Sequence, residues 1–314
     1  MNMLGIKAIA SYIPEGRASN LALAERFELD ESFLGSKIGV LERAIKAADQ
    51  DTSDLAFLAL ERLMQQQSLD PGSIQALVVV TQNPDRNIPH VSAQVHGRAG
   101  LDESCAAFDI SLGCSGFVYG VAVLRALMQA QGLERGVLVT ADPYSKIIDP
   151  EDRNTVLLFG DAATATLIGV DPVWSLEAFS LKSRGKDWQA IRTENGKFAM
   201  DGRGVFNFAA TTIPGDIAAM LAGAGVAPGD VDRFVLHQGS RFIVKSIADR
   251  LRQPLEKFPI EIEHCGNTVS STIPLIAERL LHDRSARNVV LSGFGVGLSW
   301  ASCLCRRTDA NDSQ

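Results

Sequence analysis

The sequence has few of the features that mark several large classes of protein. Its 314 residues include only five cysteines, an odd number with no regular spacing, so we expect no disulfide framework and a reducing, cytoplasmic compartment. The formal net charge is -7, and there is no zinc-finger spacing, basic tail or aromatic-and-basic motif. These absences argue against a nucleic-acid partner.

Long apolar runs are also absent. Residues 1–13 lack a basic region followed by an apolar core, so we expect no signal peptide. The longest uncharged run, Asn288 to Cys305, is rich in glycine and serine, which predicts two strands around a glycine turn and no membrane partner. Hydrophobic residues still make up 46% of the chain, enough for two domains or one large two-part core.

The most informative stretch runs from Phe108 to Phe117. An alternating apolar run at 106–112 predicts the end of a buried strand, a small-residue turn follows, and apolar residues then recur at helical spacing to about Gly132. Cys114 therefore lies at a strand-to-helix turn, where unpaired N–H groups and the helix dipole favour a thiolate. A small buried hydrophobe is the ordinary alternative for a cysteine, but this position favours a nucleophile.

The second half of the chain repeats the plan of the first. A Pro-Gly pair precedes an apolar strand at residues 231–236, just as another precedes residues 74–80 half a chain earlier. Internal symmetry of this kind indicates a duplicated domain, and strands alternating with helices predict mostly parallel sheets. We therefore expect an α/β fold of two layered halves, residues 1–170 and 171–314, with short second-half helices at 217–221 and 242–251. We also expect a surface segment at 32–39 and a polar loop at 142–154.

Two further polar residues occupy positions comparable to that of Cys114. His237 follows the strand predicted up to Leu236, and Asn267 precedes a helix predicted at 273–281. A hydrogen-bonded core histidine and a helix cap are the ordinary alternatives. We expect structural roles for the other histidines, which offer too few ligands for a metal site: His90, His96, His264 and His282. Among these, His264 is retained as a candidate neighbour of Asn267.

Five motifs occur in one order along the chain, at residues 108–117, 149–161, 236–238, 266–268 and 293–297. Together they resemble β-ketoacyl-acyl-carrier-protein synthase III of the thiolase superfamily, from about Gly5 to Arg306. The resemblance implies a thiolase-like, five-layered αβαβα fold built from two duplicated halves, usually as a homodimer. This implied fold agrees with the duplication seen in the sequence itself.

The resemblance also implies a reaction. Cys114 would accept an acyl group from acyl-CoA, and His237 and Asn267 would hydrogen-bond the thioester oxygen of malonyl-acyl-carrier protein as CO₂ is lost. The backbone N–H groups of Cys114 and Val296 would form the oxyanion hole. No metal or redox cofactor is implied. The product would be a β-ketoacyl-acyl-carrier protein, in fatty acid biosynthesis.

Weaker correspondences concern substrate binding, and an ordinary surface role is the alternative for each. Residues that correspond to CoA contacts are Lys37, Phe33, Arg153 and Ser240. Residues on one helix that correspond to a carrier-protein surface are Arg241, Lys245 and Arg250. Ile88 corresponds to a bulkier residue that reaches the partner's acyl pocket in a dimer, which predicts room for a longer or branched acyl group.

The remaining cysteines receive separate interpretations. We expect Cys303 and Cys305, which share a strand face, in the core. Cys105 lies before a predicted strand and not at the turn that follows it, and Cys265 lies near Asn267. Thiolases proper use a second cysteine in the C-terminal glycine loop, and residues 294–297 contain none. Two other functions stay open: a secondary-metabolism acyltransferase with an unusual donor or acceptor, and a non-catalytic subunit that binds acyl thioesters.

Overall fold

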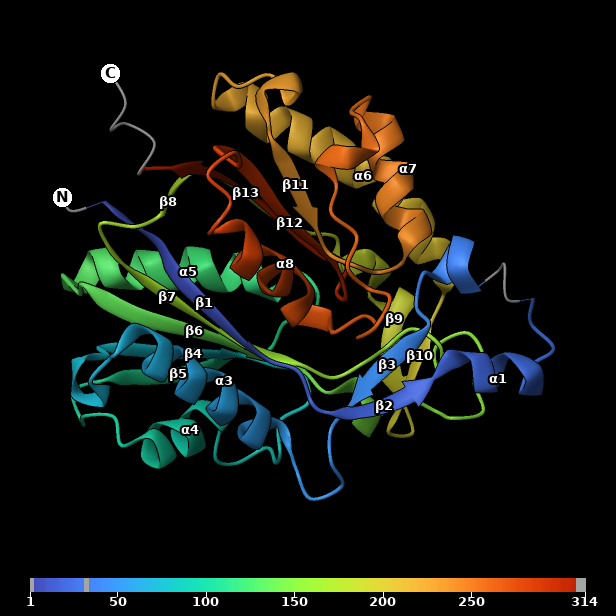
Figure 1. Cartoon of the computed structure of the whole chain (residues 1–314), viewed down its shortest axis with the longest axis horizontal. Helices are drawn as coiled ribbons and strands as arrows, with labels where there is room; N and C mark the ends of the chain where they lie inside the picture. Colours follow the sequence, from blue (N-terminus) through green and yellow to red (C-terminus); the bar gives the residue numbers. More distant parts are fainter. Residues whose placement is uncertain (1–2, 31–33, 309–314) are drawn as a thin grey trace.

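The chain folds into five layers in which helices and sheet alternate (Figure 1). The computed structural model describes residues 3–30 and 34–308. Nine strands form one sheet in the order β11-β12-β13-β8-β1-β7-β6-β4-β5. In the first half these are β1 (Leu4–Tyr12), β4 (Ala76–Val80), β5 (Ala106–Ile110), β6 (Arg135–Ala141) and β7 (Ala163–Val170). In the second they are β8 (Trp174–Ser183), β11 (Arg233–Leu236), β12 (Asn288–Gly295) and β13 (Ser299–Arg307).

The helices occupy three layers. One outer layer holds α3 (Thr52–Gln67) and α4 (Val91–Ala99), and the other holds α6 (Gly202–Gly223) and α7 (Arg241–Leu251). The central layer holds α5 (Gly116–Gln131) and α8 (Thr272–Leu280), which contact strands of both halves. The five-layered fold that the resemblance implied is therefore confirmed.

The duplication appears directly in the strand pairing. In the first half β4 runs parallel to β6, which is antiparallel to β7, which is antiparallel to β1. The second half repeats this pattern with β11, β12, β13 and β8. Among the described strands, the two parts of the sheet join by pairing of β1 with β8 at two positions, Gly5 with Ser175 and Ile6 with Trp174. The boundary at residue 170 stays a prediction, although β7 ends there.

Smaller elements cover the ends of the strands on one side of the molecule. They are β2 (Gly16–Ser19) with β3 (Glu42–Ile45), β9 (Ile191–Glu194) with β10 (Lys197–Met200), α1 (Asn20–Arg26) and a π-helical turn at Leu34–Ile38. The sequence predicted a surface segment at 32–39, but Leu34 and Ile38 are buried. This expectation was wrong because both side chains join a small apolar cluster with Leu157 and Ile262.

Two other expectations needed correction. The predicted helix at 217–221 is the end of α6, which begins at Gly202 because Asp201 caps it by accepting the Gly204 N–H. By length and apolar composition α6 could cross a membrane, as no other described helix could, yet half of it is buried against the core.

The strand β5, which precedes Cys114, is not fully buried as expected, because it is the edge of the sheet and its residues are partly exposed.

Candidate active site

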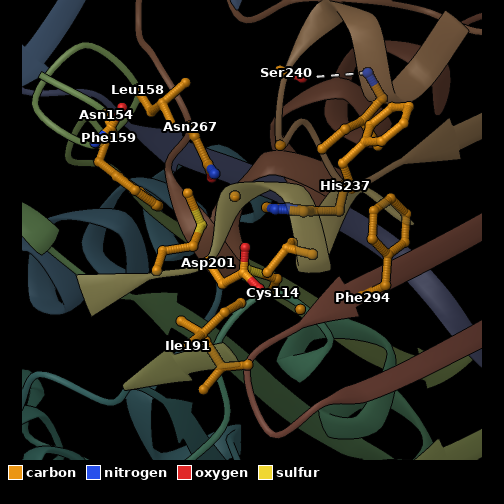
Figure 2. Close-up of a pocket in the computed structure, with 18 of the residues that line it drawn as sticks. Cys114, Asn154, Leu158, Phe159, Ile191, Asp201, His237, Ser240, Asn267 and Phe294 are labelled. Carbon is orange, nitrogen blue, oxygen red and sulfur yellow. Dashed lines mark hydrogen bonds between the residues drawn. The ribbon is translucent and has the colours of Figure 1, made fainter. Parts of the chain in front are cut away.

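Three chain segments bring Cys114, His237 and Asn267 to one cavity of about 660 Å³. Cys114 lies in the turn between β5 and α5, and His237 directly follows β11. Asn267 precedes α8, and its backbone forms a bridge with Phe159. All three side chains are at least nine-tenths buried. Figure 2 shows the His237 ring and the Asn267 amide pointing into the same cavity.

The end of β12 packs tightly against the cysteine. A Cβ atom at Gly295 would lie 2.8 Å from the Sγ of Cys114, and one at Gly293 would lie 2.4 Å from its carbonyl oxygen. Only glycine permits so close an approach. This contact holds the following residue, Val296, at the cavity wall.

Burial dominates the chemistry of the cysteine. Desolvation, followed by the nearby Asp142 carboxylate, raises the pKa of Cys114 to about 12. Backbone N–H groups of Val296 and of Cys114 itself act in the opposite direction. The expectation of an easily lost proton was therefore wrong, because desolvation outweighs the helix terminus. Those same two N–H groups are the ones expected in an oxyanion hole.

The backbone orients the amide of Asn267. Its Oδ1 accepts a hydrogen bond of 2.9 Å from the Val269 N–H, so the amide NH₂ is left for the cavity. Backbone bonds from Asn267 N to Leu158 O and from Gly160 N to Asn267 O hold the residue in place. A fixed, neutral donor therefore faces the cavity.

His237 is neutral at physiological pH because burial lowers its pKa to about 3. Its Nδ1 lies 2.9 Å from Thr272 Oγ1. The Phe294 ring packs edge-on against the imidazole, with centroids 5.6 Å apart. His237 thus has one nitrogen engaged by protein and one directed to the cavity (Figure 2).

The residues expected to contact CoA are only partly brought together. Lys37 and Ser240 line the cavity. The Lys37 Nζ lies 4.2 Å from the centroid of the Phe242 ring. Ser240 caps α7, because its hydroxyl oxygen accepts the Ile243 N–H. Arg153 is exposed and is not among the lining residues, although its neighbour in sequence, Asn154, is. Phe33 lies outside the described residues.

The expected carrier-protein residues lie on α7, next to the cavity wall. Arg241 pairs with Glu263 at 3.5 Å, Lys245 is half-buried and Arg250 is exposed. Ile88 lies on the loop before α4, and its side chain is 85% exposed. Within one chain Ile88 therefore contributes nothing to the cavity.

The other histidines and cysteines are arranged as follows. The side chain of His264 is 71% exposed and lies near Glu42 and Glu263, away from the cavity lining. Cys265 is half-buried and also absent from the lining. Cys303 and Cys305 are buried, as expected of core residues, and Cys105 is buried as well. Among the described residues no group of three or more His, Cys, Asp or Glu could hold a metal.

Two residues near the Cys114 thiol, Asp142 and Tyr144, were not predicted as site residues, because the sequence indicated only a polar loop there. The buried Tyr144 ring packs between Phe159 and Phe198, with centroids 5.0 and 5.1 Å away, and forms an aromatic cavity wall. Asp142 is fully buried, and desolvation raises its pKa to about 7. The position of Asp142, directly after the apolar strand 136–141, was the available signal.

A duplicated α/β fold with a buried cysteine, a neutral histidine and an amide in one cavity defines a condensing acyltransferase. Two family models match the chain: "3-Oxoacyl-[acyl-carrier-protein (ACP)] synthase III" at residues 108–185 and the C-terminal model of the same family at residues 221–307.

Individual relatives agree along nearly the full length. The chain is 33% identical to β-ketoacyl-[acyl-carrier-protein] synthase III of Oenococcus oeni, over 96% of this chain and 98% of the relative, and 33% identical to that of Geobacillus kaustophilus, with the same coverage. A crystal structure of the Pseudomonas aeruginosa 3-oxoacyl-(acyl carrier protein) synthase III superposes with a TM-score of 0.88 at 32% identity, covering 97% and 98% of the two chains. The chain therefore belongs to the 3-oxoacyl-[acyl-carrier-protein] synthase III family.

Proposed function

We propose that the chain catalyses the decarboxylative condensation of an acyl-CoA with malonyl-acyl-carrier protein through an acyl group on Cys114. The observation that carries this proposal is the convergence of Cys114, His237 and Asn267 on one buried cavity. The shared name of the two relatives described above, β-ketoacyl-[acyl-carrier-protein] synthase III, supports the same reaction.

The first half-reaction loads the cysteine. The Sγ of Cys114 attacks the thioester carbonyl, the carbon–sulfur bond to CoA breaks, and the thiol proton passes to the departing CoA sulfur. The N–H groups of Cys114 and Val296, which already act on the sulfur, would stabilise the oxyanion. One such donor typically lowers the barrier by about 3–4 kcal/mol.

The second half-reaction forms the new carbon–carbon bond. The malonyl carboxylate leaves as CO₂, and its bonding electrons form an enolate on the thioester. The Asn267 NH₂ group and the His237 ring, which both face the cavity, would donate hydrogen bonds to the enolate oxygen. The enolate carbon then attacks the acyl carbon and Cys114 leaves as the thiolate.

The acyl-CoA and the carrier protein would both approach the open side of the cavity. Lys37 and Ser240, with Arg153 and Phe33, would contact CoA, and no metal or redox cofactor takes part in the proposed chemistry. Arg241, Lys245 and Arg250 on the adjacent helix α7 would meet an acidic carrier protein. The starter acyl group, and whether it serves primary fatty acid synthesis or secondary metabolism, are decided by experiment.

We further propose a cytoplasmic homodimer. All five cysteines are free thiols, as in a reducing compartment. Among the strands of the described residues, β5 is at the edge of the sheet and has a neighbour on one side only. The exposed Ile88 lies on the loop leading to α4, and the first N–H groups of α4 donate hydrogen bonds to Asp109 of β5. An unpaired edge beside an exposed apolar side chain is a natural surface for a second copy.

Mass spectrometry after incubation with a panel of acyl-CoAs tests the first step, and release of labelled CO₂ from malonyl-acyl-carrier protein tests the second. We expect an adduct on Cys114 that is lost in Cys114→Ala and kept in the matched variant Cys265→Ala. An adduct without CO₂ release would indicate an acyltransferase of another kind. No adduct with any acyl-CoA would indicate a non-catalytic thioester-binding subunit.

A further inference from the structure

A glutamine amide lies close to the nucleophile. A Cβ atom at Gly113, which directly precedes Cys114, would lie 2.5 Å from the Oε1 of Gln82. The amide is therefore near the first atoms of a group bound to the Cys114 sulfur, rather than near the far end of a long chain.

The same glutamine lines a second cavity that adjoins the main one. Tyr144, Phe198 and Val296 line both cavities. Since the Val296 N–H is expected in the oxyanion hole, an acyl chain whose carbonyl oxygen lies there would run along these shared walls. Such a chain can extend into the second cavity, which has Gln82 in its wall.

Two hydrogen bonds determine which part of Gln82 is left for a substrate. The buried Tyr144 hydroxyl donates to Gln82 Oε1 at 3.2 Å, and the backbone N–H of Gln82 donates to Asp142 Oδ1 at 3.2 Å. Within the described part of the chain, no group accepts a hydrogen bond from Gln82 Nε2. An amide NH₂ group carries two donors, so Gln82 can donate to an oxygen of a substrate.

The surroundings favour an uncharged oxygen over a carboxylate. Burial, and after it the Asp142 carboxyl, raises the pKa values of Cys114 and Tyr144, so a further negative charge is disfavoured here. Arg192 also lines the second cavity, but its guanidinium is already paired with Glu194.

We propose that Gln82 is a specificity-determining residue that selects a starter acyl group with an uncharged oxygen, a hydroxyl or a carbonyl, on its third carbon. Tyr144 is a positioning residue, because its hydroxyl turns the amide so that the NH₂ group can donate to that oxygen. The inference deepens the proposed function and rests on it, since the acyl group is the one loaded on Cys114. A plain alkanoyl chain would cover the NH₂ group without offering it an acceptor, which is unfavourable for a polar group.

Matched starters test the selection. The value of kcat/KM for butanoyl-CoA is compared with those for 3-hydroxybutanoyl-CoA and 3-oxobutanoyl-CoA. We expect the wild-type enzyme to prefer at least one oxygenated starter by about 10–100-fold, and the better of the two tells hydroxyl from carbonyl. A kcat/KM for butanoyl-CoA that equals or exceeds both others would overturn the proposal, as would a preference for the anionic succinyl-CoA.

Variants test the assignment to Gln82. Gln82→Met keeps the length of the side chain but removes the amide, so we expect the oxygenated and plain starters to become nearly equal. Tyr144→Phe removes the bond that orients the amide and should give an intermediate ratio. The matched control is Gln66→Met, which changes an exposed glutamine of α3 and should keep the wild-type ratio. A wild-type ratio in Gln82→Met would overturn the proposal.

A binding measurement separates this inference from the reaction. In Cys114→Ala, which has no thiol to acylate, calorimetry with the same acyl-CoAs should give the same order of affinity, and adding Gln82→Met should remove it. Equal affinities would overturn the inference. Acylation of the wild-type enzyme without preference would also overturn it but would leave the proposed function intact. No acylation, together with a binding preference that depends on Gln82, would overturn the reaction alone.

Discussion

Burial pushes the titratable side chains around the cavity toward their neutral forms. The pKa values of Cys114 and Asp142 rise to about 12 and about 7, and that of His237 falls to about 3. Desolvation is the largest cause in each case. The buried part of the site around Cys114 and His237 therefore carries little charge at rest, in contrast to the part lined by Lys37, Asp201 and Arg203. Fixed dipoles such as the Asn267 amide can there act strongly on charge that develops during a reaction.

The Asn267 amide offers a sharp test at the scale of one residue. Asn267→Asp keeps an oxygen to accept the Val269 N–H but places a second oxygen where the NH₂ group was. We expect CO₂ release to fall about 10²–10³-fold, because a carboxylate repels the enolate, while acylation of Cys114 continues. Quench-flow acylation and labelled CO₂ release measure the two steps separately.

The same exchange at an exposed position provides the control. Asn207→Asp changes an exposed residue of α6 and should leave both steps unchanged. An Asn267→Asp enzyme that releases CO₂ at the wild-type rate would remove Asn267 from the proposed reaction.

Asp142 gives a prediction about pH and stability. Its folded pKa is about 7, up from 3.8, so between about pH 4 and pH 7 the unfolded chain releases a proton that the folded chain keeps. Stability contributed by this group is therefore lost as the pH rises through that window. Asp142→Asn removes the titration, so its free energy of unfolding relative to wild type should rise across the window, by at most about 4 kcal/mol.

Urea unfolding of both proteins at several pH values measures this difference. His237, whose pKa is lowered, has the opposite dependence in an overlapping range, but it is present in both proteins and cancels. The matched change Glu103→Gln alters an exposed carboxyl and should give a much smaller slope. A flat difference for Asp142→Asn would mean that Asp142 is ionised throughout.

Sequence reasoning located the three central residues but not the residues that orient them. Cys114, His237 and Asn267 each follow a strand or precede a helix, which is visible in hydrophobic periodicity. The left-handed backbone of Val269 and the contact of Thr272 with His237 come from tertiary packing, and no local pattern encodes them. The same holds for the pKa of Cys114, since the extent of desolvation depends on every residue around the cavity.

At the scale of elements, the end of β12 sets the space around the nucleophile. In Gly295→Ala the new Cβ would meet the Sγ and Cβ of Cys114 at 2.8 and 2.9 Å, so the cysteine or the strand end must shift. We expect acylation to slow about 100-fold, as for other displacements of about 1 Å, and the protein to lose about 1–3 kcal/mol of stability from overpacking. Single-turnover acylation and urea unfolding test both effects.

A second glycine supplies the comparison. A Cβ at Gly215 in α6 would meet no atom within 4 Å, and alanine is the better helix former by about 1 kcal/mol. Gly215→Ala should therefore stabilise the protein and leave the acylation rate unchanged. Equal rates for both alanine variants would mean that the approach of Gly295 to the thiol is not required.

Elements buried on both faces were the most predictable. The apolar run at 74–80 predicted β4 well, since all five residues of β4 are buried. The helix α6 was mostly missed, because its first turn carries Gly202 and Gly204, and Pro214 lies inside it. These residues disfavour helix locally. Its packing against β8 and β13 outweighs that local preference.

At the scale of the whole molecule, the free edge of β5 predicts a dimer. Burying an exposed isoleucine contributes about 1.5–3 kcal/mol, and Ile88 is 85% exposed in the single chain. Ile88→Asp should therefore raise the dimer dissociation constant at least about tenfold, measured by sedimentation equilibrium. Leu255→Asp, a comparable change at an exposed leucine of a different segment, should leave it unchanged. A monomeric wild-type protein would refute the dimer.

The proposed dimer would connect oligomeric state to acyl-chain selectivity. The second cavity, of about 210 Å³, adjoins the main one, because Tyr144, Phe198 and Val296 line both, and it is also lined by Gln82 and Ser111, beside β4 and β5. This second cavity lies toward the edge of the sheet, which is the surface proposed to meet the second copy. In such a dimer, the partner's Ile88 would limit how long or branched a chain can be.

Filling that space with a larger side chain should shorten the preferred acyl group. We expect the wild-type enzyme to accept longer or branched acyl-CoAs and Ile88→Phe to lower kcat/KM for them while acetyl-CoA is retained. Removing the space for one or two methylene groups should lower kcat/KM for the longer acyl-CoA relative to the shorter one by about 10–200-fold. Steady-state rates across acyl-CoAs of increasing length measure the shift. A clear wild-type preference for acetyl-CoA would show that Ile88 does not set this limit, because the pocket would then already be closed with isoleucine in place.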